Sequence, residues 1–370
     1  MRIAVDRNIP GVNETFAHHG VVDLVDGRTL DNRQLANIEV LITRSITRVG
    51  PGLLEGTPVR FVGTATIGTD HLDLAWLKQQ GIAWASAPGC NADAAAQYTL
   101  AMAWLACERL GRNLAEQSVG IIGRGKVGLR VQKLMNAIGA MTIANDPPLA
   151  DQGEKGLVSF EEALAQDLVC LHVPLSRGGP HPTFRMIDQE QLLRMGDSAL
   201  LVNTARGDVV NGKPLLSQLN SGRLHAALDV WPGEPRIDPE LVMATTVATP
   251  HVAGYSDDGK LNGTKFVYAA FCTWLGEPPA IPVNDDSEVL ELDLHTVKNP
   301  ISAVLEAACF VLRHDREMRY LAGLTPDERA THFDALRFGY PSRRDFHAWR
   351  ICGANTESAI TLRKLGFRVD

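Results

Sequence analysis

A glycine motif, Gly123-Arg124-Gly125-Lys126-Val127-Gly128, constrains the fold of this 370-residue chain more than any other segment. It directly follows the apolar run 118–122 and opens a segment whose apolar residues recur at helical spacing. Gly123 permits a tight turn, Gly125 lets the backbone approach a pyrophosphate, and Gly128 lets the helix pack closely on the sheet. The helix N-terminus, which Lys126 and Val127 begin, offers N–H groups to phosphate. The motif therefore predicts a dinucleotide-binding strand–helix–strand unit.

The next predicted strand, 141–145, ends immediately before an acid, Asp146. This residue lies about 20 residues beyond the glycines, the distance at which an acid binds the ribose hydroxyls of NAD and repels the 2′-phosphate of NADP. The alternative is a glycine-rich turn followed by an unrelated exposed acid. Strand, glycines, helix and acid together favour the cofactor site, with NAD as the cofactor.

The rest of the chain alternates short apolar runs with longer segments of helical period, which is typical of parallel α/β proteins. An alanine-rich helix is predicted at 94–107, buried on more than one side. Strands are predicted on both sides of it, at 3–5, 21–25, 40–43, 60–63, 82–86, 118–122, 141–145, 168–173, 200–203, 226–230 and 247–249. A proline-rich linker is predicted at 276–282, and residues 281–370 form a separate small α+β domain.

Composition excludes several classes of protein. The net charge is −7 and no long Lys/Arg run occurs, so nucleic acid is not the expected partner. The six cysteines lack metal-ligand spacing, and we expect neither a metal site nor a disulfide framework. The N-terminus has no apolar signal core, and no apolar run approaches the roughly 20 residues that span a bilayer. We therefore expect a cytoplasmic protein without membrane contact.

Three polar residues follow three of the predicted strands: Arg206, Glu234 and His251. Residues just beyond the carboxyl ends of parallel strands line the ligand crevice of an open α/β sheet. An arginine there binds a substrate carboxylate with its planar fork. An imidazole exchanges the hydroxyl proton while hydride leaves, and a carboxylate beside it orients the ring and favours the imidazolium. Each residue alone has an ordinary structural explanation, but the ordered set predicts oxidation of a 2-hydroxy acid.

At these residues the sequence resembles the D-2-hydroxyacid dehydrogenase family. The resemblance covers about three quarters of the chain, and it maps the family's catalytic Arg, Glu and His onto Arg206, Glu234 and His251. It rests on four segments: 123–128, 203–207, 228–235 and 249–251. It implies a Rossmann-type NAD domain at 93–253 and a flavodoxin-like substrate domain at 1–92, completed by about 254–280, with the active site between them.

A narrower resemblance points to a subgroup that oxidises 4-phospho-D-erythronate to 2-oxo-3-hydroxy-4-phosphobutanoate in pyridoxal 5′-phosphate synthesis. It rests on segments 43–49, 61–71, 88–92 and 253–264. It implies a C-terminal dimerisation domain and hence a homodimer. Its implied substrate contacts are Ser45, Thr66 and Tyr255, and cationic Arg44 lies in the same loop as Ser45. Its implied cofactor contacts, beyond the glycines, are Lys126, Val127, Asp146, Asp229 and Gly254. One departure is Val173, where relatives can carry a threonine.

Two alternatives remain open. A sister enzyme acting on 3-phosphoglycerate would carry a ferredoxin-like βαββαβ module after residue 280, and a dinucleotide-sensing scaffold would not need the acid–base residues. For the C-terminal domain we expect an apolar helical stripe that forms a two-fold interface. Arg343 and Arg344 are expected near the partner's cleft. The stripe comprises Ile301, Val304, Leu305, Ala308, Val311 and Leu312, with aromatic residues at Phe333, Phe338, Tyr340, Phe346 and Trp349.

Overall fold

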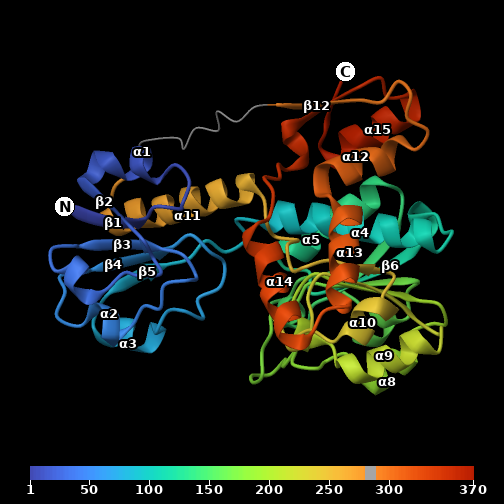
Figure 1. Cartoon of the computed structure of the whole chain (residues 1–370), viewed down its shortest axis with the longest axis horizontal. Helices are drawn as coiled ribbons and strands as arrows, with labels where there is room; N and C mark the ends of the chain where they lie inside the picture. Colours follow the sequence, from blue (N-terminus) through green and yellow to red (C-terminus); the bar gives the residue numbers. More distant parts are fainter. Residues whose placement is uncertain (280–288) are drawn as a thin grey trace. The chain divides into compact units, whose positions relative to one another are not determined.

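The computed structural model describes residues 1–279 and 289–370 (Figure 1). The chain divides into two compact units: residues 1–91 with 256–279, and residues 92–255 with 289–370. The predicted linker lies outside the described residues from residue 280 on. Residues 289–370 thus belong to the same compact unit as the glycine motif. The division into three domains stays a prediction.

The first unit is a five-stranded parallel sheet in the order β2-β1-β3-β4-β5, the flavodoxin-like arrangement. Alternate residues of its strands point to opposite faces, so Ile3 and Val5 join one apolar cluster and Ala4 joins the other. The long helix α11 covers the first face with Val267 and Phe271 (Figure 1). The strands are β1 (Arg2–Asp6), β2 (Val21–Val25), β3 (Val40–Thr43), β4 (Phe61–Thr64) and β5 (Ala83–Ala85), and the helices are α1 (Val12–Phe16), α2 (Pro51–Leu54), α3 (Leu74–Gln79) and α11 (Asp257–Leu275).

The second unit is built on a six-stranded parallel sheet in the order β11-β10-β9-β8-β6-β7. The strand order reverses at β6, which is the switch point where doubly wound sheets bind ligands. The strands are β6 (Ser118–Ile122), β7 (Met141–Asn145), β8 (Leu168–Leu171), β9 (Leu200–Asn203), β10 (His225–Leu228) and β11 (Val247–Ala248). The helices are α4 (Ala92–Arg109), α5 (Lys126–Ala137), α6 (Pro147–Asp151), α7 (Phe160–Leu164), α8 (Gln189–Arg194), α9 (Gly212–Asn220) and α10 (Pro239–Ala244). The predicted Rossmann-type α/β fold is confirmed.

Helix α4 is buried on more than one side, as its composition predicts. Tyr98, Leu100 and Met102 are all fully buried, although they point in different directions around the helix. Its small alanines allow α5 and the C-terminal helix α12 (Pro300–Cys309) to pack against it. The helix therefore joins the C-terminal segment to the core of the Rossmann sheet.

The C-terminal segment carries a second, three-stranded sheet in the order β12-β13-β14, and both of its strand pairs are parallel. Its elements are β12 (Leu290–Asp293), α12, α13 (Val311–Ala322), α14 (Pro326–Phe338), β13 (Trp349–Cys352), α15 (Thr356–Leu365) and β14 (Arg368–Val369). Helices therefore alternate with parallel strands here, whereas an α+β domain segregates them. The predicted apolar stripe at 301–312 does not lie on a single helix. Phe310, with a φ of 56°, ends α12 and precedes α13.

Two expectations about this segment are wrong. The apolar stripe packs inside the chain: Val304, Leu305, Ala308 and Val311 are buried in the cluster that contains α4. It is therefore unavailable as a two-fold interface. Arg343 and Arg344 are also buried, with Arg343 only 2% exposed, because the loop before β13 folds inward. Arg343 therefore does not extend toward a partner.

Candidate active site

The three predicted catalytic residues follow neighbouring strands at one edge of the sheet of the second unit. Arg206 comes after β9, Glu234 after β10 and His251 after β11, and these strands are adjacent in the order β11-β10-β9. All three strands are parallel, so their carboxyl ends lie at the same edge. The topology thus gathers three residues that are far apart in sequence.

Glu234 and His251 are in direct contact. The Nδ1 atom of His251 lies 2.6 Å from Oε2 of Glu234, and the other carboxylate oxygen accepts the backbone N–H of Trp231 at 2.8 Å. The indole of Trp231 in turn donates to the carbonyl of Thr249, just before the histidine. The two side chains are 27% and 17% exposed, so Nε2 of the ring remains the nitrogen that can meet a ligand. Geometry of this kind suits a proton-transfer group oriented by a carboxylate.

Arg206 is exposed, and its guanidinium donates to the carbonyl of Ala205 at 2.8 Å and, within the described residues, makes no hydrogen bond with Glu234 or His251. Its backbone is held by Asn203, whose side-chain amide donates to the Arg206 carbonyl at 3.0 Å. The next residue must be glycine, because a Cβ on Gly207 would stand 2.0 Å from the carbonyl oxygen of Trp231. The loop after β9 is therefore pressed against the loop after β10, with the arginine side chain left accessible.

Asp229, a predicted cofactor contact, is fully buried. Its Oδ1 atom accepts the Thr249 hydroxyl at 2.6 Å and the Val252 N–H at 3.0 Å, while Oδ2 accepts the Ala253 N–H at 3.0 Å. These bonds hold the Thr249 side chain before His251 and the backbone after it. In this structure the Asp229 carboxylate positions the loop that carries His251. A contact of this carboxylate with the cofactor stays a prediction.

The glycine motif forms the expected cradle. Gly123 has a φ of 90°, and a Cβ there would meet His172 and Val173 at 2.8 Å. A Cβ on Gly128 would lie 1.9 Å from the Gly123 carbonyl oxygen, so strand and helix touch at this point. Gly125 is the N-cap of α5 and has nothing within 4 Å of its hypothetical Cβ. The space above Gly125 and the N–H groups of Lys126 and Val127 fit a pyrophosphate.

Asp146 stands at the end of β7, beside the glycine motif. Its Oδ2 accepts the backbone N–H of Arg124 at 2.8 Å, and Oδ1 accepts the N–H of Leu149 as the N-cap of α6. The Arg124 guanidinium is held by Gln132 at 2.9 Å and by Glu154 at 3.0 Å. The acid therefore lies against the backbone of the glycine motif, and the Arg124 side chain is already paired with a carboxylate; a contact of Asp146 with a ribose stays a prediction.

In the first unit, Arg44, Ser45 and Thr66 follow β3 and β4, which are adjacent strands. Arg44 makes a two-point ion pair with the buried Asp6, with Nε–Oδ2 at 3.0 Å and Nη2–Oδ1 at 3.2 Å. This pair anchors the loop that presents Ser45, an exposed residue. Arg44 is therefore a support of the loop in this structure, and its contact with substrate stays a prediction.

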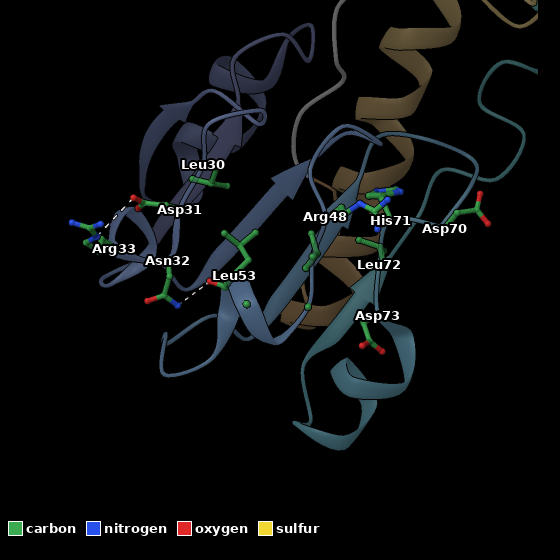
Figure 2. A pocket seen from close by; sticks show the side chains of 13 residues that line it. Leu30, Asp31, Asn32, Arg33, Arg48, Leu53, Asp70, His71, Leu72 and Asp73 are labelled. Carbon is green, nitrogen blue, oxygen red and sulfur yellow. Dashed lines mark hydrogen bonds and ion pairs between the residues drawn. The ribbon is translucent and has the colours of Figure 1, made fainter. Parts of the chain in front are cut away.

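A cavity of about 710 Å³ opens at this same edge of the first sheet (Figure 2). Its lining includes Arg48 and His71 among apolar side chains such as Leu53 and Leu72. Figure 2 shows Asn32 bonded to the Leu53 carbonyl, and Asp70 pointing away from the other labelled side chains. The cavity borders one predicted substrate contact, because the His71 ring bonds the Thr64 hydroxyl at 2.9 Å and that hydroxyl bonds Thr66 at 2.8 Å. Burial lowers the pKa of His71, which favours the neutral ring.

Sequence reasoning missed several of these supports. Asp6 ends β1 beside β3, so its pairing with Arg44 follows from strand adjacency once the sheet order is known. His71 was not among the predicted site residues. His172 lies just beyond β8, and neither ring nitrogen has a partner among the described residues. Burial lowers the pKa of His172 to about 3. Cys170 is a fully buried core residue.

The remaining predicted contacts lie next to the histidine loop. Gly254 and Tyr255 follow Ala253 directly, and the Tyr255 ring packs edge-on against Tyr340 with centroids 5.6 Å apart. Within the described residues, no group of three or more His, Cys, Asp or Glu side chains is arranged to hold a metal ion. Among the same residues, no helix is long and apolar enough to cross a membrane.

Comparison with known proteins agrees with this geometry. Residues 90–253 match the family model described as D-isomer specific 2-hydroxyacid dehydrogenase, NAD binding domain. An erythronate-4-phosphate dehydrogenase from Pseudomonas aeruginosa is 41% identical, over 99% of each chain. The chain belongs to the erythronate-4-phosphate dehydrogenase family. Another member, from Escherichia coli O81, is 38% identical over 99% of this chain and 98% of its own.

Among solved structures, the NAD-complexed D-isomer specific 2-hydroxyacid dehydrogenase of Lactobacillus delbrueckii is similar in fold. Its TM-score is 0.65 at 23% identity, and the match covers 76% of this chain and 99% of that one. This structure shows the same fold, and the family model over residues 90–253 confirms the NAD-binding domain predicted from the glycine motif. Membership in the erythronate-4-phosphate dehydrogenase family extends over the full chain, including the C-terminal segment that the family model does not cover.

Proposed function

We propose that this chain oxidises 4-phospho-D-erythronate to 2-oxo-3-hydroxy-4-phosphobutanoate with NAD, as a step in pyridoxal 5′-phosphate synthesis. The observation that carries the chemistry is the 2.6 Å contact between His251 and Glu234 beside Arg206 at one sheet edge. Kinship over the full chain with erythronate-4-phosphate dehydrogenases supports the substrate.

In this proposal the residues have separate tasks. Arg206 binds the substrate carboxylate and orients the carbon that carries the hydroxyl group. His251 accepts the hydroxyl proton at Nε2, because Nδ1 is held by Glu234. The carboxylate of Glu234 stabilises the imidazolium that forms. NAD held at the glycine motif would supply the hydride acceptor, so that the alcohol would become a ketone while His251 keeps the hydroxyl proton.

The residues around the glycine motif fit the cofactor. The open space at Gly125 suits a pyrophosphate, and Arg124 is paired with Glu154 and so is not free to bind a 2′-phosphate. We therefore propose NAD over NADP. The cytoplasm is the proposed location, consistent with six cysteines that are all free thiols.

The two alternatives have less support. A ferredoxin-like βαββαβ module would contain antiparallel strand pairs, but β12, β13 and β14 pair in parallel. This argues against an enzyme of the 3-phosphoglycerate class with that regulatory module. A non-catalytic sensor has no use for a histidine held by a carboxylate at a sheet edge, and this contact is present.

The test is NADH formation from three substrates: 4-phospho-D-erythronate, 3-phospho-D-glycerate and D-lactate. We expect the highest kcat/KM with the first. His251→Asn should lower kcat by on the order of 10²–10⁴-fold while leaving NADH binding intact. A higher kcat/KM with either other acid would reject the substrate, and wild-type turnover by His251→Asn would reject the mechanism.

We also propose a homodimer formed through the C-terminal segment. The buried stripe cannot supply its interface, but Tyr320 on α13 and Phe338 on α14 are 68% and 70% exposed. Exposed aromatic side chains are enriched in protein interfaces. Light scattering should give the mass of two chains, and a monomer at micromolar concentration would reject the dimer.

A further inference from the structure

Arg343 lies in the loop between α14 and β13 and is almost completely buried, with 2% of its surface exposed. Its Nη2 atom donates two hydrogen bonds to backbone carbonyls, at 3.0 Å to Ala94 and at 2.9 Å to Ala253. The guanidinium also lies over the ring of Tyr98, 5.1 Å from its centroid. Hydrogen bonds from a charged donor are among the stronger ones, and a buried site strengthens them further.

The bond from Arg343 to Ala253 matters because of where Ala253 lies in the chain. It lies two residues after His251, and its N–H is already bound by Asp229. The loop after His251 is therefore bound by two buried side chains. The Asp229 carboxylate accepts the N–H groups of Val252 and Ala253, and the Arg343 guanidinium donates to the Ala253 carbonyl. Asp229 and Arg343 are both buried, so water does not compete for these hydrogen bonds.

The backbone of His251 needs such support. Its φ of 58° lies in the left-handed region, which costs a residue with a side chain about 1–2 kcal/mol. Residues in this region persist when the surrounding structure fixes them. Here the fixed points are the Asp229 carboxylate, the Glu234 carboxylate and the Arg343 guanidinium.

A second contact links the same C-terminal loop to the residue beyond Ala253. Tyr340 packs edge-on against Tyr255, a predicted substrate contact, and its other ring neighbour is His314 on α13, with centroids 5.2 Å apart. His314 bonds the Tyr98 hydroxyl at 2.8 Å. Thus α4, α13 and the loop at 340–343 form one packed support beneath the histidine loop.

We propose that Arg343 is a positioning residue for the acid–base loop, acting through the backbone of Ala253 to keep His251 on Glu234. Arg343 touches neither substrate nor cofactor in this proposal. Through Arg343 the C-terminal segment helps to position the catalytic loop of the same chain. The catalytic consequence rests on the proposed function, while the effect on the loop backbone does not.

The experiment compares Arg343→Met and Arg343→Lys with a matched control, Arg329→Met. Arg329 is also a buried arginine that donates to backbone carbonyls, those of Ile237, Leu321 and Leu324, but it lies on α14 with no bond to the histidine loop. Each variant is measured for kcat, KM, NADH binding and amide hydrogen exchange in peptides that cover 249–255. Amide exchange reports how well the N–H groups of Val252 and Ala253 are protected, and it does not depend on catalytic activity.

For Arg343→Met we expect exchange at 249–255 to rise at least several-fold and kcat to fall on the order of 10–100-fold, because small misplacements of catalytic groups have effects of this size. NADH affinity should change less than twofold. Arg343→Lys should recover part of kcat, because it retains one donor. Arg329→Met should lower thermal stability without raising exchange at 249–255.

Three outcomes would overturn or separate the claims. Unchanged exchange and unchanged kcat in Arg343→Met would reject the inference. Equal effects in Arg329→Met would reject it too, because the loss would then be general destabilisation. If Arg343→Met does not fold, Arg343→Lys decides by the same two readouts. If the wild type oxidises none of the three acids but exchange rises only in the Arg343 variants, the proposed function fails and the inference stands.

Discussion

Of the three predicted catalytic side chains, only that of Arg206 is exposed, so it can be replaced with little effect on packing. Arg206→Lys keeps the charge but loses the fork that matches a carboxylate. We expect kcat/KM to fall on the order of 10–100-fold, the equivalent of losing a charged hydrogen bond. Steady-state kinetics beside a thermal melt will check this. An unchanged kcat/KM would remove Arg206 from the substrate site.

In the proposed mechanism Glu234 acts on the reaction through its contact with His251. Glu234→Gln keeps the size of the side chain but removes the charge that stabilises the imidazolium. The ring then loses its proton at lower pH, so the acidic limb of the kcat/KM profile for alcohol oxidation should move to lower pH. Profiles of wild type and variant should be compared in the same buffers. If the two limbs coincide, the carboxylate is structural and the pairing has no catalytic role.

His172 should make the fold sensitive to acid. Its pKa is lowered from 6.5 to about 3 by burial, so the unfolded chain binds a proton in this range that the folded chain does not. The free energy of unfolding therefore falls as pH drops below about 6.5, by up to about 1.4 kcal/mol per pH unit from this residue. His172→Leu should flatten that slope without loss of stability at pH 7, since neither ring nitrogen has a partner among the described residues.

Urea unfolding at pH 7, 6 and 5 will measure this slope. His314 has a similarly lowered pKa of about 3 and remains in both proteins, so the difference between wild type and variant isolates His172. An identical slope in the two proteins would show that the buried ring is already protonated, or solvated, in the fold.

At the scale of elements, Asp146 serves both as N-cap of α6 and as the acid beside the cofactor site. Two substitutions separate these roles. Asp146→Ser keeps a capping oxygen and Asp146→Ala does not, whereas both remove the charge that repels a 2′-phosphate. We expect both to narrow the preference for NAD over NADP, and only the alanine variant to lose about 1 kcal/mol of stability.

The measurement is the ratio of kcat/KM with NAD to that with NADP, together with urea melts. Glu154→Gln added to Asp146→Ser should narrow the ratio further, because it frees the Arg124 guanidinium. Comparable use of NADP by the wild type would contradict the assignment of Asp146.

At the scale of the whole molecule, the C-terminal segment and the Rossmann sheet share one apolar core. Leu305→Ala, on α12, should therefore lower the free energy of unfolding by about 2–5 kcal/mol and reduce hydrogen-exchange protection in α4. Leu193→Ala, at an exposed position on α8, is the control and should change stability by less than about 0.5 kcal/mol. If Leu305→Ala leaves α4 protection unchanged, the segment folds as a separate domain.

Most of the sheet architecture could be predicted from local sequence patterns. The predicted strands at 21–25, 40–43, 118–122, 141–145 and 200–203 match the observed bounds. Apolar runs of this length are set by burial on both faces of a parallel sheet, a property that is local in sequence. The placing of Arg206, Glu234 and His251 after adjacent strands followed from the same pattern, since carboxyl ends of parallel strands share an edge.

The contacts of the C-terminal segment could not be predicted in this way, because they depend on how the elements pack. An apolar stripe such as 301–312 has the same pattern whether it faces a partner or its own chain, and here it packs on α4. The polar contacts could not be predicted either. The bonds from Arg343 to Ala94 and Ala253 join residues more than 80 positions apart in sequence, and no local sequence pattern indicates such a pairing. Sequence periodicity reports which side chains are buried, whereas their partners are fixed by how the elements pack.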